Sequence, residues 1–393
     1  MSKIIYADHS ATTAVRPEVL EAMLPYFTES YGNPSTIYDL GQKNREAVDH
    51  ARAQVARAIG ALAGEIYFTG CGTESDNWAI KGIAEAYGAK GKHIITSNVE
   101  HHAVLHTCQW LEKQGYEVTY LPVDSEGFIR PEQLEAAIRP DTILVSIMFA
   151  NNEIGTVNPI EKLGEVCAAH KVYFHVDAVQ AVGTLPIDVK AMHIDMLSMS
   201  AHKFYGPKGV GALYVRKGIR LPSFIHGGAQ ESKRRAGTEN VPGIVGIGKA
   251  IELATAEMEE NAKRLRAMRD ALIAGIEERI PYCRLNGSRT ERLPGHVNFS
   301  FQFIEGESML MLLNMAGICG SSGSACTSGS LDPSHVLLAI GLPHEIAHGS
   351  LRLSLGRENT MDDVNYILEK LPPIVERLRA MSPLYEDFIK KNN

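Results

Sequence analysis

Residues 194–213 read IDMLSMSAHKFYGPKGVGAL, and this stretch indicates both a fold and a chemistry. An apolar run typical of a buried strand ends at Ser200, and Lys203 follows within three residues. The glycine-rich GPKGVG segment predicts a tight turn into a hairpin strand over residues 210–215. Upstream, FHVDAVQ places Asp177 at the end of a second apolar run. We therefore expect the lysine and the carboxylate to meet at the ends of neighbouring strands.

A lysine paired with a buried carboxylate is the arrangement that pyridoxal phosphate requires. The amine forms a Schiff base with the cofactor, and the carboxylate keeps the pyridine nitrogen protonated. Lys208 is the rival for the Schiff base, but Pro207 and Gly209 on either side indicate the tip of a turn. Lys203 is therefore the predicted Schiff-base lysine.

Short β-branched runs alternate with helical stretches between about residues 65 and 215, which predicts a mostly parallel, seven-stranded sheet with helices on both faces. The expected strands are residues 66–69, 93–97, 117–122, 142–149, 172–176, 194–199 and 211–215. Five of them end in a polar cluster. Ligands bind at the carboxyl ends of such strands, so the clusters predict one site.

A chain of 393 residues is long for one hydrophobic core. We expect a large α/β domain over residues 16–255 and a smaller α/β domain formed by residues 1–15 and 256–393. The smaller domain would contain strands at 282–285, 296–303 and 351–354 and helices at 307–315, 333–340 and 361–381. A long helical pattern over residues 241–280 would bridge the two.

The composition argues against several classes of function. The net charge of −7 argues against a nucleic-acid-binding surface. No apolar run reaches 18 residues, and the apolar stretch near the start is too short for a signal peptide, so we expect a soluble, cytoplasmic protein without a membrane span. The six cysteines form no C-x-x-C pair, so no metal site is expected.

Other strand-end residues suggest how the cofactor is held. Gly72 and Thr73 form a glycine-rich turn that opens a helix, which suits a phosphate, and Ser200 and His202 would converge on the same group. Capping of the helix by Thr73 is the alternative.

Further residues would face the cofactor ring. His101 and His102 begin the helix after Ser97, and one of them could stack on the ring or relay protons, or simply cap the helix. Asn152 and Gln180 could bind the ring hydroxyl oxygen, although both residue types are also common in turns.

Two residues point to the substrate. Cys326 lies in SSGSACTSGS, residues 321–330, where a cysteine has no apolar packing role and is a candidate nucleophile once its thiol is deprotonated. Arg352 lies in an alternating strand pattern, where a guanidinium suits a substrate carboxylate. Arg357 is the rival clamp, and a salt bridge of Arg352 within the protein is the alternative.

Together these motifs resemble the group I cysteine desulfurases of the NifS/IscS type, within the class-V aminotransferase-like pyridoxal enzymes. The resemblance runs from end to end and rests on ADHSATT, YGNPST, GCGTESD, EHHAVL, ANNEIGT, FHVDAVQAVG, MSAHKFYGPKGVG, RRAGTEN, SSGSACTSGSLDPSHVL and SPLY. His9 and Ser10 depart from the asparagine or alanine that is common in the family, which affects the wall on the substrate side.

The resemblance implies a fold-type I architecture and a homodimer with sites at the subunit interface. It implies that Lys203, Asp177, Gln180, Asn152 and His101 contact the cofactor ring. Phosphate would be bound by Gly72, Thr73, Ser200 and His202, with Thr238 supplied by the partner subunit.

The implied reaction converts L-cysteine to L-alanine and leaves a persulfide on Cys326, with Arg352 binding the substrate carboxylate. The sulfur would pass to an acceptor or iron–sulfur scaffold protein. Selenocysteine lysis or transamination, and a catalytically idle scaffold, are the rival interpretations.

Overall fold

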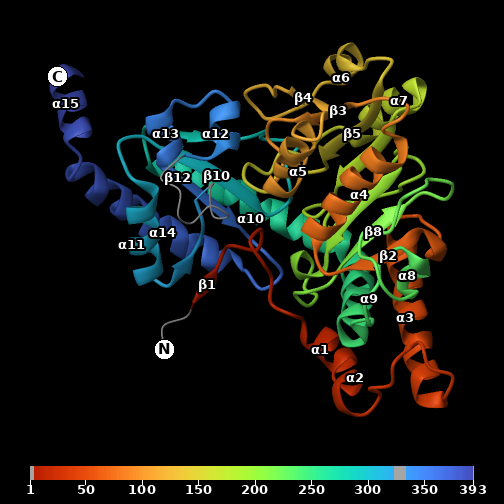
Figure 1. Cartoon of the computed structure of the whole chain (residues 1–393). Helices are drawn as coiled ribbons and strands as arrows, with labels where there is room; N and C mark the ends of the chain where they lie inside the picture. The colour runs from red at the N-terminus through yellow and green to blue at the C-terminus, as the bar shows by residue number, and fades with distance from the viewer. Residues whose placement is uncertain (1–3, 323–332, 393) are drawn as a thin grey trace.

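The computed structural model describes residues 4–322 and 333–392, which form two α/β units lying side by side (Figure 1). The larger unit is built on a seven-stranded sheet whose two edges are β2 and β4. In spatial order its strands are β2 (Ile66–Thr69), β8 (Gly211–Val215), β7 (Met196–Ser200), β6 (Tyr173–Asp177), β5 (Thr142–Met148), β3 (His93–Ser97) and β4 (Glu117–Leu121). Strand β8 pairs antiparallel with β2 and β7, and the other pairings are parallel. The mostly parallel sheet expected from the sequence is confirmed.

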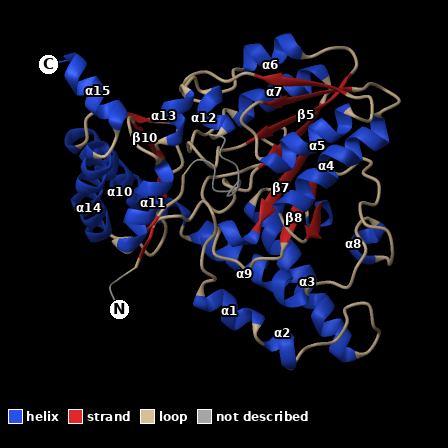
Figure 2. Ribbon diagram, turned by 60° about the vertical axis from the view of Figure 1, so that its left-hand side comes forward, coloured by secondary structure: helices blue, strands red, loops and turns tan. Residues whose placement is uncertain are grey.

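Helices cover both faces of this sheet (Figure 2). One face shares a core with α1 (Pro17–Met23), α3 (Asp39–Ala58), α6 (Pro131–Ala137), α7 (Ile160–His170) and α9 (Val241–Ala256). The other face packs against α4 (Gly72–Tyr87) and α5 (His102–Glu112). Because successive side chains on a strand point to opposite faces, Val145 joins the first core and Leu144 the second.

The central strands end at the same level. Met148 pairs with Asp177, and Asp177 pairs with Ser198. The loops that follow these strands therefore open on one edge of the sheet, which is where polar strand-end residues can meet.

The smaller unit contains a three-stranded antiparallel sheet in the order β12 (Ser350–Ser354), β10 (His296–Phe301) and β9 (Cys283–Leu285). Helices α10 (Met258–Arg279), α11 (Gly306–Met315) and α14 (Met361–Ala380) share its core. The described part of the chain as a whole also includes short helices of four or five residues, namely α2 (Pro25–Thr28), α8 (Gln230–Lys233), α12 (His335–Ala339) and α13 (His344–His348). The C-terminal helix α15 (Pro383–Asn392) projects from this unit (Figure 1).

The start of the chain joins the smaller unit. Strand β1 (Ile5–Tyr6) pairs in parallel with β11 (Ile318–Cys319), and Ile5 and Ala7 are buried in the core of that unit. The domain division at residues 15 and 255 stays a prediction, which this distribution of buried side chains supports.

The single long helix expected over residues 241–280 is wrong. Helix α9 ends at Ala256 and α10 starts at Met258, because Glu257 leaves the helical conformation with φ −100° and ψ 2°. The Glu257 carboxylate accepts hydrogen bonds from the Arg16 guanidinium at 2.8 and 3.0 Å. A tertiary ion pair at the junction is invisible to helical periodicity, which continues through it.

None of the helices that the structure describes is long and apolar enough to span a membrane.

Candidate active site

A cavity of about 390 Å³ opens at the carboxyl ends of the central strands. Ten of the twelve predicted site residues line it, and they come from strand ends far apart in the sequence. The lining residues are Ser10, Ala11, Cys71, Gly72, Thr73, Asp76, His101, Met148, Ala150, Asn152, Asp177, Val179, Gln180, Ser200, His202, Lys203 and Arg352.

Lys203 lies at the end of a short 3-10 turn that directly follows β7. Its amine donates hydrogen bonds to the backbone carbonyls of Ser10 and Ala11, the latter at 2.9 Å. The N-terminal segment thus orients the amine at the wall of the cavity. Lys208, the rival, is exposed at the following turn and does not line the cavity.

Asp177 is the last residue of β6, and its carboxylate accepts a hydrogen bond from the Val179 amide at 3.0 Å. Burial raises the pKa of Asp177 to about 6, while the Val179 amide and the Lys203 amine act in the opposite direction. A buried carboxylate beside an amine suits a partner that brings a positive charge.

Helix α4 begins at Gly72, so its first backbone N–H groups point toward the cavity wall formed by Gly72 and Thr73. The packing here requires glycine: a Cβ at Gly72 would lie 2.7 Å from Val179 Cγ2 and 3.5 Å from Ser200 Cβ. The helix N-terminus, with Ser200 beside it, forms an anion cradle.

His202 lies between the phosphate side of the cavity and the N-terminal segment. Its Nδ1 atom is 3.0 Å from Thr12 Oγ1, and burial lowers its pKa to about 4. The imidazole is therefore neutral at pH 7.

His101 is both a helix cap and a cavity residue. Its Nδ1 atom accepts a hydrogen bond from the Ala103 amide at 3.1 Å. Burial, with a smaller contribution from Lys203, lowers the pKa of His101 to about 4. The ring is therefore neutral at pH 7. His101 caps α5 and also lines the cavity, and its stacking on a cofactor ring stays a prediction.

Gln180 and Asn152 both reach the cavity. Gln180 donates from Nε2 to the Ser10 carbonyl at 3.0 Å. The Asn152 carbonyl accepts a hydrogen bond from Arg352 at 3.0 Å, and His296 Nε2 lies 3.2 Å from it. Asn152 is thereby fixed beside the predicted substrate clamp.

Arg352 is only 2% exposed and forms the salt bridge that the sequence left open. Its Nη2 lies 2.8 Å from Asp8 Oδ1, and Ser321 Oγ donates to the other Asp8 oxygen at 2.6 Å. The Arg352 Nε atom is buried and has no hydrogen-bond partner among the described residues. A buried guanidinium with an unused donor on a cavity wall is suited to a carboxylate.

Two predicted site residues lie elsewhere. Cys326 lies outside the described residues. Thr238 is exposed and does not line the cavity of its own chain. The segment before Thr238 is connected to the turn at the anion cradle, because Arg235 Nε donates to Glu74 Oε1 at 2.8 Å and Glu74 also accepts from the Gly70 amide.

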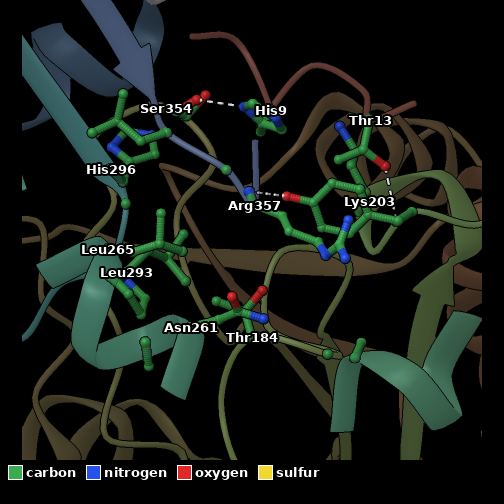
Figure 3. A pocket seen from close by; sticks show the side chains of 18 of the residues that line it. His9, Thr13, Thr184, Lys203, Asn261, Leu265, Leu293, His296, Ser354 and Arg357 are labelled. Carbon is green, nitrogen blue, oxygen red and sulfur yellow. Dashed lines mark hydrogen bonds between the residues drawn. The ribbon is translucent and has the colours of Figure 1, made fainter. Parts of the chain in front are cut away.

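A second cavity, drawn in Figure 3, shares Ser10, Gln180 and Lys203 with the first. It lies where the two units meet and contains Arg357, the rival clamp. Arg357 Nε lies 3.6 Å from Glu257, and its backbone amide donates to the Tyr205 hydroxyl at 2.7 Å. Arg357 is therefore separated from the cavity that holds Asp177 and Arg352.

Sequence reasoning missed Asp8 and three buried acids, Asp76, Glu100 and Glu153. Each acid sits inside a motif that was quoted for other residues. The burial of these acids depends on residues that are far away in the sequence. The sequence itself shows only that an acidic residue occurs among apolar or uncharged polar residues near the end of a strand.

The residues of the first cavity fit pyridoxal phosphate. The Lys203 amine matches its aldehyde, Asp177 its pyridine nitrogen and the Gly72–Thr73 turn its phosphate. Glycine at position 72 lets this turn pack closely against Val179 and Ser200. The fold is that of fold-type I pyridoxal-phosphate enzymes, and this donor set suits their cofactor.

Comparison with known proteins agrees with this class. The class-V aminotransferase pattern matches residues 5–367. A cysteine desulfurase IscS from Methanosarcina thermophila is 63% identical over 383 residues, covering 98% of this chain and 95% of the relative. A solved NifS-like protein superposes with a TM-score of 0.90 at 40% identity, covering 95% of this chain and all of that one. SspA in complex with cysteine superposes with a TM-score of 0.80 at 40% identity, covering 89% and 98%.

The chain belongs to the class-V aminotransferase family and, within it, to the cysteine desulfurases. Enzymes of this family depend on pyridoxal phosphate.

Proposed function

We propose that this protein is a pyridoxal-phosphate-dependent cysteine desulfurase that converts L-cysteine to L-alanine and supplies the sulfur, as a persulfide on Cys326, for iron–sulfur cluster assembly. The observation that carries the proposal is the meeting of Lys203, Asp177 and Arg352 in one cavity. An amine, an acid for the ring nitrogen and a clamp for a carboxylate describe a site for an amino acid and this cofactor.

The cofactor would be held by Gly72, Thr73, Ser200 and His202 at its phosphate and by Asp177 at its ring nitrogen. His101, Asn152 and Gln180 would contact the ring and its oxygen. When bound, pyridoxal phosphate supplies an electron-withdrawing ring that stabilises negative charge at the substrate Cα.

Lys203 would move the protons. Its Nζ takes the proton from the substrate Cα and later returns a proton to product carbon, while the Ser10 and Ala11 carbonyls keep the amine at the cavity wall. Neutral His101 adds no second positive charge beside the Lys203 amine. Proton transfer by a positioned amine is general acid–base catalysis.

Arg352 would select an α-amino acid by binding its carboxylate, with Asn152 beside it. A buried donor that has no acceptor costs free energy. A ligand that lacks a carboxylate would leave the Arg352 Nε donor without an acceptor, so Arg352 would favour a ligand that has one.

Cys326 would accept the sulfur. Its thiolate attacks the substrate sulfur, an S–S bond forms as the C–S bond breaks, and the electron pair stays with the carbon that becomes the alanine methyl group. Ser321, shortly before this cysteine in the chain, is hydrogen-bonded to Asp8 of the Arg352 pair. Ser321 itself therefore lies next to the proposed substrate clamp.

We also propose a homodimer, a sulfur acceptor or scaffold protein as partner, and a cytoplasmic location. The dimer is supported by large apolar side chains exposed between residues 20 and 38, among them Phe27 at 56%, Tyr31 at 69% and Ile37 at 95%. It is also supported by Thr238, which is exposed outside its own cavity and would complete the partner's phosphate site.

The test is a single-turnover experiment with the purified yellow protein and L-cysteine. We expect one alanine per active site and an added sulfur on Cys326 by mass spectrometry. Cys326→Ala should keep the visible absorption of the cofactor and its response to cysteine, yet release alanine at least a hundredfold more slowly. Sulfur found on Cys71 or Cys319, or wild-type alanine release by Cys326→Ala, would contradict the proposal.

A further inference from the structure

A row of buried polar side chains lies beneath the candidate cofactor cavity and is not used by the reaction described above. Ser146 of β5, His175 of β6 and Ser198 of β7 are all 0% exposed. Their strand neighbours Phe174 and Val176 point into the core of α3 and α7, so these three side chains point to the opposite face, toward α4. His175 Nδ1 lies 2.8 Å from Ser146 Oγ, and Nε2 lies 2.9 Å from Ser198 Oγ.

Asp76 of α4 covers this row. It is 1% exposed, and its Oδ1 lies 3.6 Å from His175 Nε2, which is longer than a hydrogen bond. Oδ1 has no hydrogen-bond partner among the described residues. Asp76 also lines the cavity together with Asp177, so an unpartnered carboxyl oxygen lies in the wall of the cofactor site.

Three buried acids share this region, and they cannot all be charged. Burial raises the pKa of Asp76 well above its usual range, with Asp177 and Glu100 adding to the rise and a hydrogen bond with Ser198 acting in the opposite direction. Burial raises the pKa of Glu100 to about 8, and His175 is neutral because burial lowers its pKa to about 3. Asp177 alone has both a backbone N–H and the Lys203 amine to stabilise its charge.

Resting on the function proposed above, we propose that Asp76 is a positioning residue of the cofactor site. It is a neutral carboxylic acid that packs on the Ser146–His175–Ser198 row and leaves Asp177 as the one negative charge facing the ring nitrogen. The groups facing Asp76 are Asp177 and His175 from β6, Ser198 from β7 and Glu100 from the start of the α5 region. Within the described part of the chain, no cation acts on Asp76, whereas Lys203 acts on Asp177.

The first experiment measures charge. Urea unfolding of wild type and Asp76→Asn is compared at equal cofactor content between pH 5 and pH 7. Unfolded Asp76 loses its proton near pH 4 and the folded residue keeps it, so the wild-type unfolding constant should rise relative to Asp76→Asn by about tenfold per pH unit. A flat ratio would show that folded Asp76 is charged, and would overturn the proposal.

The second experiment measures positioning. Pyridoxal phosphate is titrated into wild type, Asp76→Asn, Asp76→Leu and, as the matched control, Asp177→Asn, and the visible band is followed with pH. Asp76→Asn should bind within about threefold of wild type with an unmoved band. Asp76→Leu should lose at least tenfold in affinity, and so should Ser198→Ala, which is the second variant if Asp76→Leu does not fold.

The outcomes separate the two proposals. Wild-type affinity in Asp76→Leu and Ser198→Ala would remove the positioning function, and a loss in Asp76→Asn as large as in Asp177→Asn would make Asp76 the charged partner of the ring. A wild-type protein that binds no pyridoxal phosphate would overturn the proposed function instead, while the pH ratio would still decide the charge of Asp76.

Discussion

Removing the Arg352 side chain should damage stability and catalysis through two separable causes. Arg352→Ala takes away a cation that is 2% exposed and bonded to Asp8 at 2.8 Å and to the Asn152 carbonyl at 3.0 Å. Losing one partner of a buried pair costs about 3–5 kcal/mol. The Asp8 side chain is 14% exposed and keeps its hydrogen bond from Ser321. We therefore expect a loss at the lower end of that range, about 3 kcal/mol in the free energy of unfolding measured with urea.

The double variant Asp8→Asn/Arg352→Ala separates the causes. In Arg352→Ala the Asp8 carboxylate is left without its cation, and the double variant removes that negative charge. About 2 kcal/mol of the lost free energy of unfolding should therefore be recovered. Turnover should not return, because the substrate carboxylate still lacks its clamp. In both variants kcat/KM for cysteine should fall by about tenfold to a hundredfold, the value of a charge-assisted pair.

Arg357→Ala is the matched control. Its ion pair with Glu257 is 3.6 Å long, and the two side chains are 38% and 35% exposed, so its loss should cost less than about 1 kcal/mol. Its kcat/KM should stay near that of wild type. If kcat/KM recovers together with stability in the double variant, the Arg352→Ala defect is structural and Arg352 is not the clamp.

Three further changes test the scaffold around the site. Glu231→Gln should cost about 3 kcal/mol in urea unfolding, because the Glu231 carboxylate accepts from Arg52 at 2.7 and 2.8 Å and from the Phe68 amide at 2.9 Å; a change under about 1 kcal/mol would contradict this. Gly72→Ala should lower the free energy of unfolding by about 1–3 kcal/mol and weaken cofactor binding, because the added methyl group clashes with Val179. The double variant Gly72→Ala/Val179→Ala should restore stability and cofactor binding; if it restores neither, the clash with Val179 is not the cause. Burial raises the pKa of Glu153 from 4.5 to about 7, so the folded protein keeps a proton that the unfolded chain releases, and stability should fall by about 3 kcal/mol between pH 4.5 and pH 7. Glu153→Gln should lack that fall in urea midpoints measured at both pH values, and parallel curves for the two proteins would show that Glu153 is not protonated in the fold.

The features that sequence predicted are the ones with local signals. Apolar runs bounded by polar turns located the seven strands of the large sheet within two residues, because burial on both faces requires near-continuous apolar strands. Lys203 and Asp177 were found because a polar residue at the end of such a run has few packing functions. The meeting of nine of the ten predicted residues in one cavity follows from parallel strands ending on one edge, and the tenth, Arg352, comes from β12 of the smaller unit.

The features that sequence did not predict depend on distant partners or on backbone strain. Asp8 and Arg352 are 344 residues apart, and no pattern in either segment specifies the pair. The break at Glu257 depends on Arg16, at the other end of the chain. Glu231, Ser232 and Lys233 all have positive φ, which none of these residue types favours, and the buried Glu231 carboxylate holds them there.

The pairing of β1 with β11 has a consequence for biosynthesis. Ile5 leaves the ribosome first and pairs with Ile318, and the Ala7 carbonyl accepts from the Ser354 amide. At a synthesis rate of roughly 5–20 residues per second, the first strand waits for about 15–60 s for these partners. The seven strands of the large sheet are already synthesised by residue 215. The carbonyls of Ser10 and Ala11 reach the Lys203 amine from this waiting segment. A nascent chain therefore has all seven strands of its large sheet before the strand partners of its N-terminal segment are synthesised.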